Sequence, residues 1–192
     1  MGRDLYGVTV VAAEQPVTLA EAKAWCKVTH TNDDDLITGL IVAATLRAEM
    51  YTNRVFVSRT FTGKFECLEL SDYEKGPFFQ VRRAPLISLT FIKVYVDDVL
   101  TTISSDDYNL KQTSGFSRII FEEINDSPDL IPYPYEISFT AGYGEDGDVP
   151  ELIKVAIKDA VAYWYQNRGD CGDLPKMSKM NLRSFKILNT YG

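Results

Sequence analysis

The sequence has 192 residues, of which 45% are hydrophobic and 24% charged, a composition typical of a globular protein. Twenty Lys and Arg against 27 Asp and Glu give a net charge of −7, which argues against DNA binding driven by an overall positive field. The first residues lack the basic-then-apolar order of a signal peptide. Because no run approaches the roughly 18 apolar residues of a membrane span, we expect no membrane association.

The segment from residue 15 to residue 53 predicts two helices. Thr18 and Glu21 have the spacing of a capping box, in which each side chain satisfies a free amide at a helix start. This first helix is short and ends near Lys27. Aspartates at 33–35 fill the first turn of a second helix, where carboxylates face free amides and the positive dipole end. Apolar residues at 36, 40, 43 or 44, 48 and 51, widened by 37 and 41, repeat at helical spacing to about Asn53.

β-branched and aromatic residues dominate from residue 55 onward. Strands are expected at 55–61, 64–70, 78–81, 86–96, 99–103, 108–111, 118–121 and 136–141. Asp97-Asp98 and Ser114-Gly115 are placed as hairpin turns, and prolines at 128, 132 and 134 exclude regular structure between the last two strands. Short strands at this spacing predict an antiparallel sandwich or barrel-like sheet.

A third helix begins at Pro150, which suits the first helical position. Ile153, Ile157 and Trp164 share one face of it, and the helix ends near Gly169. The remaining residues carry mixed charge and few apolar side chains, so we expect a tail that is disordered alone and becomes ordered on docking.

These elements predict an α+β fold in which the helices form one core and an antiparallel β region is inserted between them. We expect an N-terminal helical arm at 1–54, the inserted β region at 55–141, a hinge with the long C-terminal helix at 142–169, and a C-terminal tail at 170–192. The long helix packs with residues 18–54. The expected hinge residues are Gly142, Gly144, Gly147 and Pro150.

The sequence from Gly142 to Gly147 matches G-x-G-x-x-G, follows a predicted strand and precedes a helix, as a dinucleotide-binding loop does. Two features argue against that function. Glu145, Asp146 and Asp148 place negative charge where a pyrophosphate would lie, and Pro150 removes one of the amides that would bind it. We interpret the loop as a bend between strand and helix.

Other candidates for chemistry have simpler interpretations. The three cysteines, Cys26, Cys67 and Cys171, have neither disulfide nor zinc spacing, so reduced thiols are expected. His30 is the single histidine and stands in a loop, where it has no convincing nucleophile beside it. We therefore expect no catalytic residue, no metal site and no cofactor.

Aromatic and basic residues suggest protein contacts instead. Tyr163, Trp164 and Tyr165 are consecutive on a helix and cannot all face the core, and exposed aromatics favour protein interfaces. The arginines are scattered among acidic residues, which does not indicate a nucleic-acid surface. The candidate subunit or partner contacts are Tyr51, Arg54, Tyr163, Tyr165, Arg168, Arg183, Phe185 and Lys186.

Two stretches resemble a known family. The first contains Pro-Val-Thr-Leu-Ala-Glu-Ala-Lys at 16–23, Asp-Asp-Asp-Leu-Ile at 33–37 and Tyr-Thr-Asn-Arg at 51–54; the second contains Phe-Thr-Ala-Gly-Tyr-Gly at 139–144 and continues through 149–157 to 165–168. Together they resemble the head–tail connector (adaptor) family of tailed bacteriophages and prophages, in its longer form with a central β region. The resemblance covers about half of the chain, and the middle shares only a strand-and-hairpin character.

This resemblance implies a structural virion protein that is assembled in the bacterial host cytoplasm. Such proteins assemble into a ring, commonly of twelve copies, which lies beneath the portal at the capsid vertex. The ring links the portal protein to a neck stopper or tail-completion protein, and DNA passes through it without sequence-specific binding. The family has no catalytic residues and no cofactor.

Two other functions remain open from the sequence. The chain can be a monomeric β-type binding module with helical arms, which would bind through its sheet. It can also be a nucleotide-binding enzyme that uses the loop from Gly142 to Gly147.

Overall fold

A computed structural model describes residues 5–10, 14–65, 68, 76–81, 83–112, 117–122, 132–144, 148–167 and 172–187. The chain forms two compact units: a helical unit of residues 12–57 and 143–192, and a β unit of residues 1–11 and 58–142. Helices and antiparallel sheets both contribute substantially, which confirms the expected α+β class. Among the described residues, no helix has the length and apolarity that a membrane span requires.

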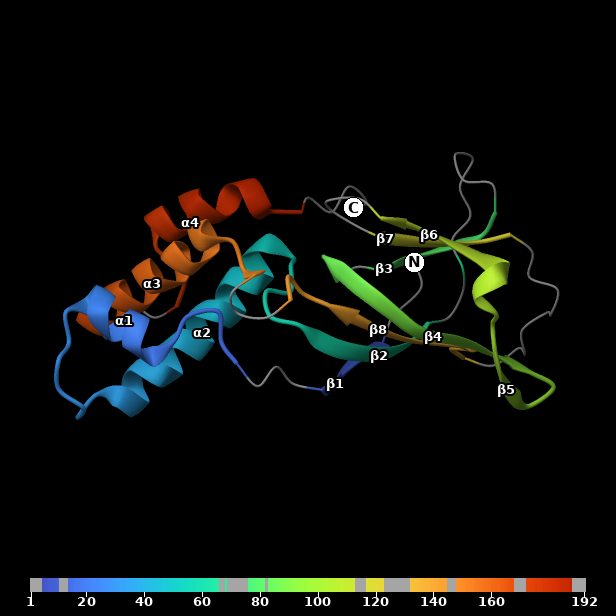
Figure 1. Cartoon of the computed structure of the whole chain (residues 1–192), viewed down its shortest axis with the longest axis horizontal. Helices are drawn as coiled ribbons and strands as arrows, with labels where there is room; N and C mark the ends of the chain where they lie inside the picture. Colours follow the sequence, from blue (N-terminus) through green and yellow to red (C-terminus); the bar gives the residue numbers. More distant parts are fainter. Residues whose placement is uncertain are drawn as a thin grey trace. The chain divides into compact units, whose positions relative to one another are not determined.

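Within its described residues, the helical unit consists of four α-helices and a closing 3₁₀ turn (Figure 1). They are α1 (Leu19–Cys26), α2 (Asp34–Thr52), α3 (Glu151–Gln166), α4 (Lys176–Leu182) and the turn Arg183–Phe185. Helix α3 packs against the other three helices. Its face of Ile153, Ile157 and Trp164 is fully buried, as the helical spacing predicted.

The start of α1 has the capping box expected from the sequence. The Glu21 amide donates to Thr18 Oγ1 at 3.3 Å, and the Thr18 amide donates to Glu21 Oε2 at 2.8 Å. The acidic residues at the start of α2 do not cap the helix as expected. Asp33 is the N-cap residue, but its side chain makes no capping hydrogen bond. Its carboxylate instead accepts a hydrogen bond from Tyr165 of α3, and Asp34 pairs with Lys23 of α1. These carboxylates thus join α2 to its neighbours.

The buried face of α2 is rotated from the one that the sequence suggested. Ile37, Ile41, Ala44 and Ala48 are buried in the helical core, whereas Leu36 is exposed. The two isoleucines, expected at the edge of the apolar stripe, therefore lie at its centre. The small residues at 44 and 48 allow the close approach to α3 that the alanine content predicted.

The prediction of a disordered tail is wrong for residues 176–185. Leu174 and Leu182 are buried in the same core as α3, and the Trp164 indole nitrogen donates to the Asp173 carbonyl at 3.2 Å. The Ile187 amide donates to the Thr52 carbonyl at 2.9 Å, which fixes the end of this segment against α2. Leu174 and Leu182 supply enough apolar surface to hold α4 in place, because they pack into the same core as the buried face of α3.

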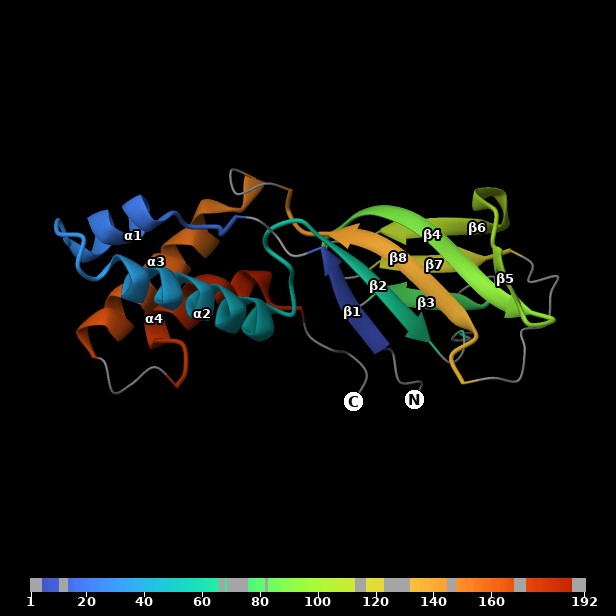
Figure 2. The same cartoon turned by 90° about the horizontal axis from the view of Figure 1, so that it is seen from below.

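The described residues of the β unit form two antiparallel sheets (Figure 2). The five-stranded sheet has the order β1-β2-β8-β4-β5, and the three-stranded sheet has the order β3-β7-β6. The strands are β1 (Leu5–Val10), β2 (Arg59–Phe65), β3 (Phe78–Val81), β4 (Leu86–Val96), β5 (Val99–Thr102), β6 (Tyr108–Gln112), β7 (Ser117–Phe121) and β8 (Tyr135–Ala141). A short 3₁₀ turn, Ser105–Asp107, precedes β6.

The two sheets pack face to face as a sandwich. Phe65 of β2 stacks on Phe79 of β3, with ring centroids 4.0 Å apart, and also on Tyr135 of β8 at 5.1 Å. Burial alternates along β7, where Ser117, Ile119 and Phe121 are buried and the residues between them are partly exposed. That alternation is the period of two expected when one face of a sheet covers a core.

The strands differ from the prediction at the start of the β region and near the N-terminus. Strand β2 begins at Arg59, and Phe56 and Val57 instead belong to the core of the helical unit. Their aromatic and β-branched side chains gave the same sequence signal as a strand. Strand β1 was not predicted; it pairs antiparallel with β2 at the edge of the larger sheet. The turn at Asp97 and Asp98 is confirmed, with both residues at positive φ (51° and 61°) between β4 and β5.

Candidate interaction surface

Four of the expected contact residues meet one another inside the helical unit. Arg54 Nε donates to the Phe185 carbonyl at 2.6 Å, and the Lys186 ammonium lies 4.8 Å from the centre of the Tyr51 ring. These contacts join the end of α2 to the segment after α4. The sequence therefore selected residues that lie together in space, but Arg54 and Phe185 are occupied within one copy.

The three consecutive aromatics of α3 point in different directions, as expected. Trp164 is buried, Tyr163 is exposed, and the Tyr165 hydroxyl donates to Asp33. Of these, Tyr163 has the exposed ring that a partner can contact. Arg183 is exposed as well, and the expected contact Arg168 lies outside the described residues.

The expected hinge begins with two glycines in conformations that other residues rarely adopt. Gly142 has φ 142° and Gly144 has φ 119°. A Cβ at Gly144 would also collide with the Asp148 carboxylate, so this position requires glycine for two reasons. Pro150 stands immediately before α3, at the N-cap. Gly147 lies outside the described residues.

Helix α2 has a second apolar face, which the sequence analysis did not separate from the buried one. Leu36, Val42, Leu46 and Met50 are exposed, Leu46 by 49% and Met50 by 70%. At 100° per residue Val42, Leu46 and Met50 lie on the side opposite the buried isoleucines, and Leu36 lies at the edge of that side. The sequence carried a signal for this second face, namely apolar residues on more than one side of the helix. A helix of that kind is normally covered on every side, so an exposed apolar side indicates a contact surface.

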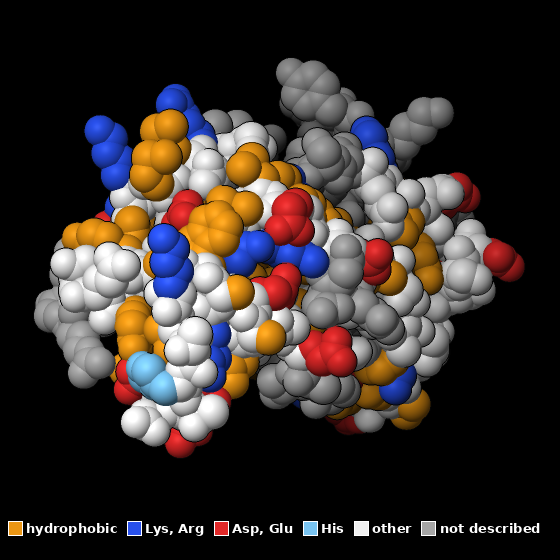
Figure 3. Space-filling model, turned by 60° about the vertical axis from the view of Figure 1, so that its left-hand side comes forward, with side chains coloured by type: hydrophobic (Ala, Val, Ile, Leu, Met, Phe, Trp, Pro, Cys, Tyr) orange, Lys and Arg blue, Asp and Glu red, His pale blue; other side chains and the backbone are white. Residues whose placement is uncertain are grey.

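Helix α4 also has an exposed face, which combines methionines with basic residues. Met177 is 57% exposed and Met180 60% exposed. Lys176 and Arg183 are exposed on the same side of the helix. Figure 3 shows hydrophobic side chains exposed next to Lys and Arg on the surface of the protein. Methionine side chains are flexible and polarizable, which suits them to protein interfaces.

A polar network links three helices on another side of α3. Asp159 accepts hydrogen bonds from Trp25 Nε1 of α1 at 3.2 Å and from Asn181 Nδ2 of α4 at 3.5 Å. Burial raises the pKa of Asp159 above its ordinary value, an effect that the bond from Trp25 and the nearby Lys158 partly oppose. The Lys158 ammonium lies 5.4 Å from the Trp25 ring centre and bonds to Glu151 Oε1 at 3.1 Å. The network is structural, since every polar group in it has a partner.

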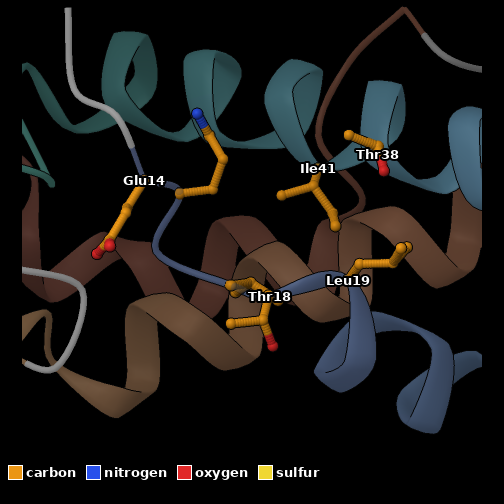
Figure 4. Close-up of a pocket in the computed structure, with 7 residues that line it drawn as sticks. Glu14, Thr18, Leu19, Thr38 and Ile41 are labelled. Atoms are coloured by element: carbon orange, nitrogen blue, oxygen red, sulfur yellow. The ribbon is translucent and has the colours of Figure 1, made fainter.

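A pocket of about 490 Å³ lies between α2 and the start of α1. It is lined by Glu14, Gln15, Val17, Thr18, Leu19, Thr38 and Ile41. Figure 4 shows Ile41 extending from α2 toward the segment that carries Thr18 and Leu19. Thr38 precedes the exposed Val42 by one helical turn, so the pocket adjoins the exposed apolar face of α2.

Within the part of the chain that the structure describes, no group of three or more His, Cys, Asp and Glu side chains forms a metal site. Burial raises the pKa of the Cys26 thiol, so the reactive thiolate form is disfavoured there. His30 Nε2 is 3.9 Å from Asp33 Oδ2, a carboxylate that already accepts a bond from Tyr165.

Comparison with known proteins supports the resemblance. Residues 16–77 match a phage family, the gp6-like head-tail connector proteins. The sequence resemblance to head–tail connectors is thereby confirmed. The matched segment contains α1, α2 and β2, and it includes the N-terminal stretch of the resemblance but not the second stretch, from 139 to 168. No match was found among curated proteins.

Solved structures extend the similarity to nearly the whole chain. A chain in the neck of an empty GTA particle, computed with C6 symmetry, superposes with a TM-score of 0.74 and 19% identity over 98% of both chains. A chain in the virion of a native gene transfer agent (GTA) particle gives 0.73 and 19% over 97% of both. One in the neck of the native particle, computed with C12 symmetry, gives 0.73 and 19% over 98% of both. The chain therefore has the fold of these neck proteins.

Proposed function

We propose that this chain is a head–tail connector subunit in the neck of a tailed phage, a prophage or a gene transfer particle. The observation that carries the proposal is that both units match neck chains together, over 98% of each chain. The connector family match at residues 16–77 supports it independently, from sequence. A shared helical fold alone would be weaker evidence, because one fold serves many functions.

In this proposal the subunit forms a ring, with twelve copies as the expected number. The ring joins the portal protein to the next neck or tail component, and DNA passes through it without sequence-specific contacts. The symmetries of the similar neck structures, C6 and C12, are compatible with such a ring. The net charge of −7 suits a channel that must not hold DNA tightly.

The two units have separate roles in this assembly. The helical unit forms the subunit-to-subunit wall, with α2 and α3 at its centre, and the β unit meets a neighbour or a tail component. Tyr163, Arg183 and Lys186 are the exposed residues from the expected set. The bend from Gly142 through Gly147 to Pro150 acts as the hinge that carries the chain from β8 into α3.

We propose that the protein is not an enzyme. Two observations argue against dinucleotide binding at the glycine loop. Strand β8, which leads into the loop, pairs antiparallel with both β2 and β4, whereas the dinucleotide-binding fold requires parallel strands. The Asp148 carboxylate fills the space beside Gly144, where it would repel a phosphate.

Electron microscopy of the protein mixed with its cognate portal tests the proposal. We expect an added ring of density on the portal face that points away from the capsid. Portal particles that look identical with and without the protein would contradict the proposal. They would instead favour the alternative, a monomeric binding module. A dinucleotide that raises the melting temperature would favour the enzyme alternative, by linkage.

A further inference from the structure

The helical unit exposes two unlike surfaces that none of its described residues covers. The first is the apolar face of α2, defined by Leu36, Val42, Leu46 and Met50. From Leu36 to Met50 it extends about 21 Å along the helix. The second is the basic face of α4, defined by Lys176, Met177, Met180 and Arg183.

These two faces point in different directions. Helices α2 and α4 both pack against α3, and Figure 1 shows them on different sides of it. On each helix the exposed face is opposite the residues buried against the core, namely Ile37 and Ile41 on α2 and Ser178 and Leu182 on α4. One copy therefore cannot bring its own two faces together.

The charges near the N-terminal end of the α2 face complement those of the α4 face, whereas Arg47 is exposed toward the C-terminal end of the α2 face. Residues 174–187 contain four basic side chains and no acidic one, and two of the four, Lys176 and Arg183, flank the methionines. The apolar face of α2 begins beside exposed Asp35, and exposed Glu14 lines the adjoining pocket. Docking would bury methionines on apolar side chains and place Lys and Arg near carboxylates at the rim.

We infer that the basic face of α4 in one copy docks on the apolar face of α2 in the next copy. The pairing joins two different patches, so a docked pair of copies retains one free patch of each kind, and further copies add until the rotation between them closes a ring. This inference rests on the proposed function, because it names the contact that would build the connector ring. The pocket beside Val42 is the concave part of the α2 surface and receives a methionine side chain.

Complementation between two variants tests the pairing. Leu46→Asp disables the face on α2, and Met180→Asp disables the face on α4; both residues are exposed, so the fold is retained. Val99→Asp, at an exposed apolar residue of β5, is the matched control. Sedimentation up to about millimolar protein should show wild type and control associating equally. Each disabled variant alone should associate at least tenfold more weakly. Their mixture should form one-to-one dimers and nothing larger, because only one intact pair of faces remains per two copies.

A crosslink tests the same contact directly, also on the cognate portal. In chains whose three native cysteines are changed to Ser, Leu46→Cys and Met180→Cys copies should form a disulfide when mixed with oxidised glutathione, which takes up the two electrons, whereas either variant alone should not. A mixture that fails to crosslink, or variants that associate like wild type, would overturn the pairing and leave the ring proposal standing. Wild type that never associates, in solution or on the portal, would contradict the ring itself.

Discussion

Leu182 offers a decisive test of the C-terminal helix, because the sequence predicted a disordered tail there and the structure buries this side chain completely. Leu182→Ala removes three carbon atoms. At about 0.8 kcal/mol for each buried carbon, the lost transfer free energy is about 2.4 kcal/mol. The cavity left between α4 and α3 adds to it, so we expect a loss of about 3 to 4 kcal/mol in the free energy of unfolding.

Urea unfolding followed by tryptophan fluorescence measures this loss selectively. The chain has two tryptophans, Trp25 and Trp164, and both belong to the helical unit. Met180→Ala is the matched control, because Met180 lies on the same helix with 60% of its surface exposed, and its substitution should change stability by less than about 0.5 kcal/mol. If Leu182→Ala were as mild as Met180→Ala, α4 would not be part of the core and the account of the helical unit would be refuted.

Four further predictions concern local structure. Thr18→Ala removes one half of the capping box and should lower the stability of the helical unit by about 1 kcal/mol in the same urea assay. The hydrogen bond from the Thr18 backbone amide holds the pKa of Glu21 below its ordinary value of 4.5. The Glu21 carboxylate therefore contributes its full stabilisation above pH 4.5, and this stabilisation is lost as the pH falls through the lowered pKa of the folded protein. The stability difference between wild type and Glu21→Gln should shrink below pH 4.5, and a difference that stayed constant would contradict this. Gly144→Ala should destabilise by about 1 to 3 kcal/mol because of its positive φ, and pairing it with Asp148→Ala should restore only the part due to the carboxylate collision. Asp98→Gly should raise the melting temperature of the β unit, followed by far-UV circular dichroism, because glycine adopts φ 61° without strain; a lower melting temperature would show that the Asp98 side chain stabilises the turn.

Local signals predicted most of the elements correctly. The capping box at Thr18 and Glu21 located α1, the apolar spacing of Ile153 and Ile157 located the buried face of α3, and Asp97-Asp98 located a hairpin. Each of these is decided by residues close in sequence, where hydrogen-bond geometry and side-chain period dominate. The family resemblance came from two stretches, the N-terminal motifs at 16–54 and the segment from 139 to 168.

Features that depend on distant partners were not predicted. The strand β1 forms because β2 offers an unpaired edge, and α4 is ordered because α3 exposes a site for Leu182. Likewise, Phe56 and Val57 have a strand-like sequence but pack among helices. For the candidate surface, the sequence correctly selected Tyr163 and Arg183, which are exposed. It missed the second apolar face of α2, because apolar residues on two sides of one helix give the same spacing pattern as one broad apolar face.

The mass of the complex between this protein and its cognate portal tests the central claim most directly. Native mass spectrometry of the purified complex should show the portal ring plus twelve copies of a 21.6-kDa subunit, the number we propose for the ring. A portal ring that gains no mass in the presence of excess protein would contradict the proposal that this chain is a connector.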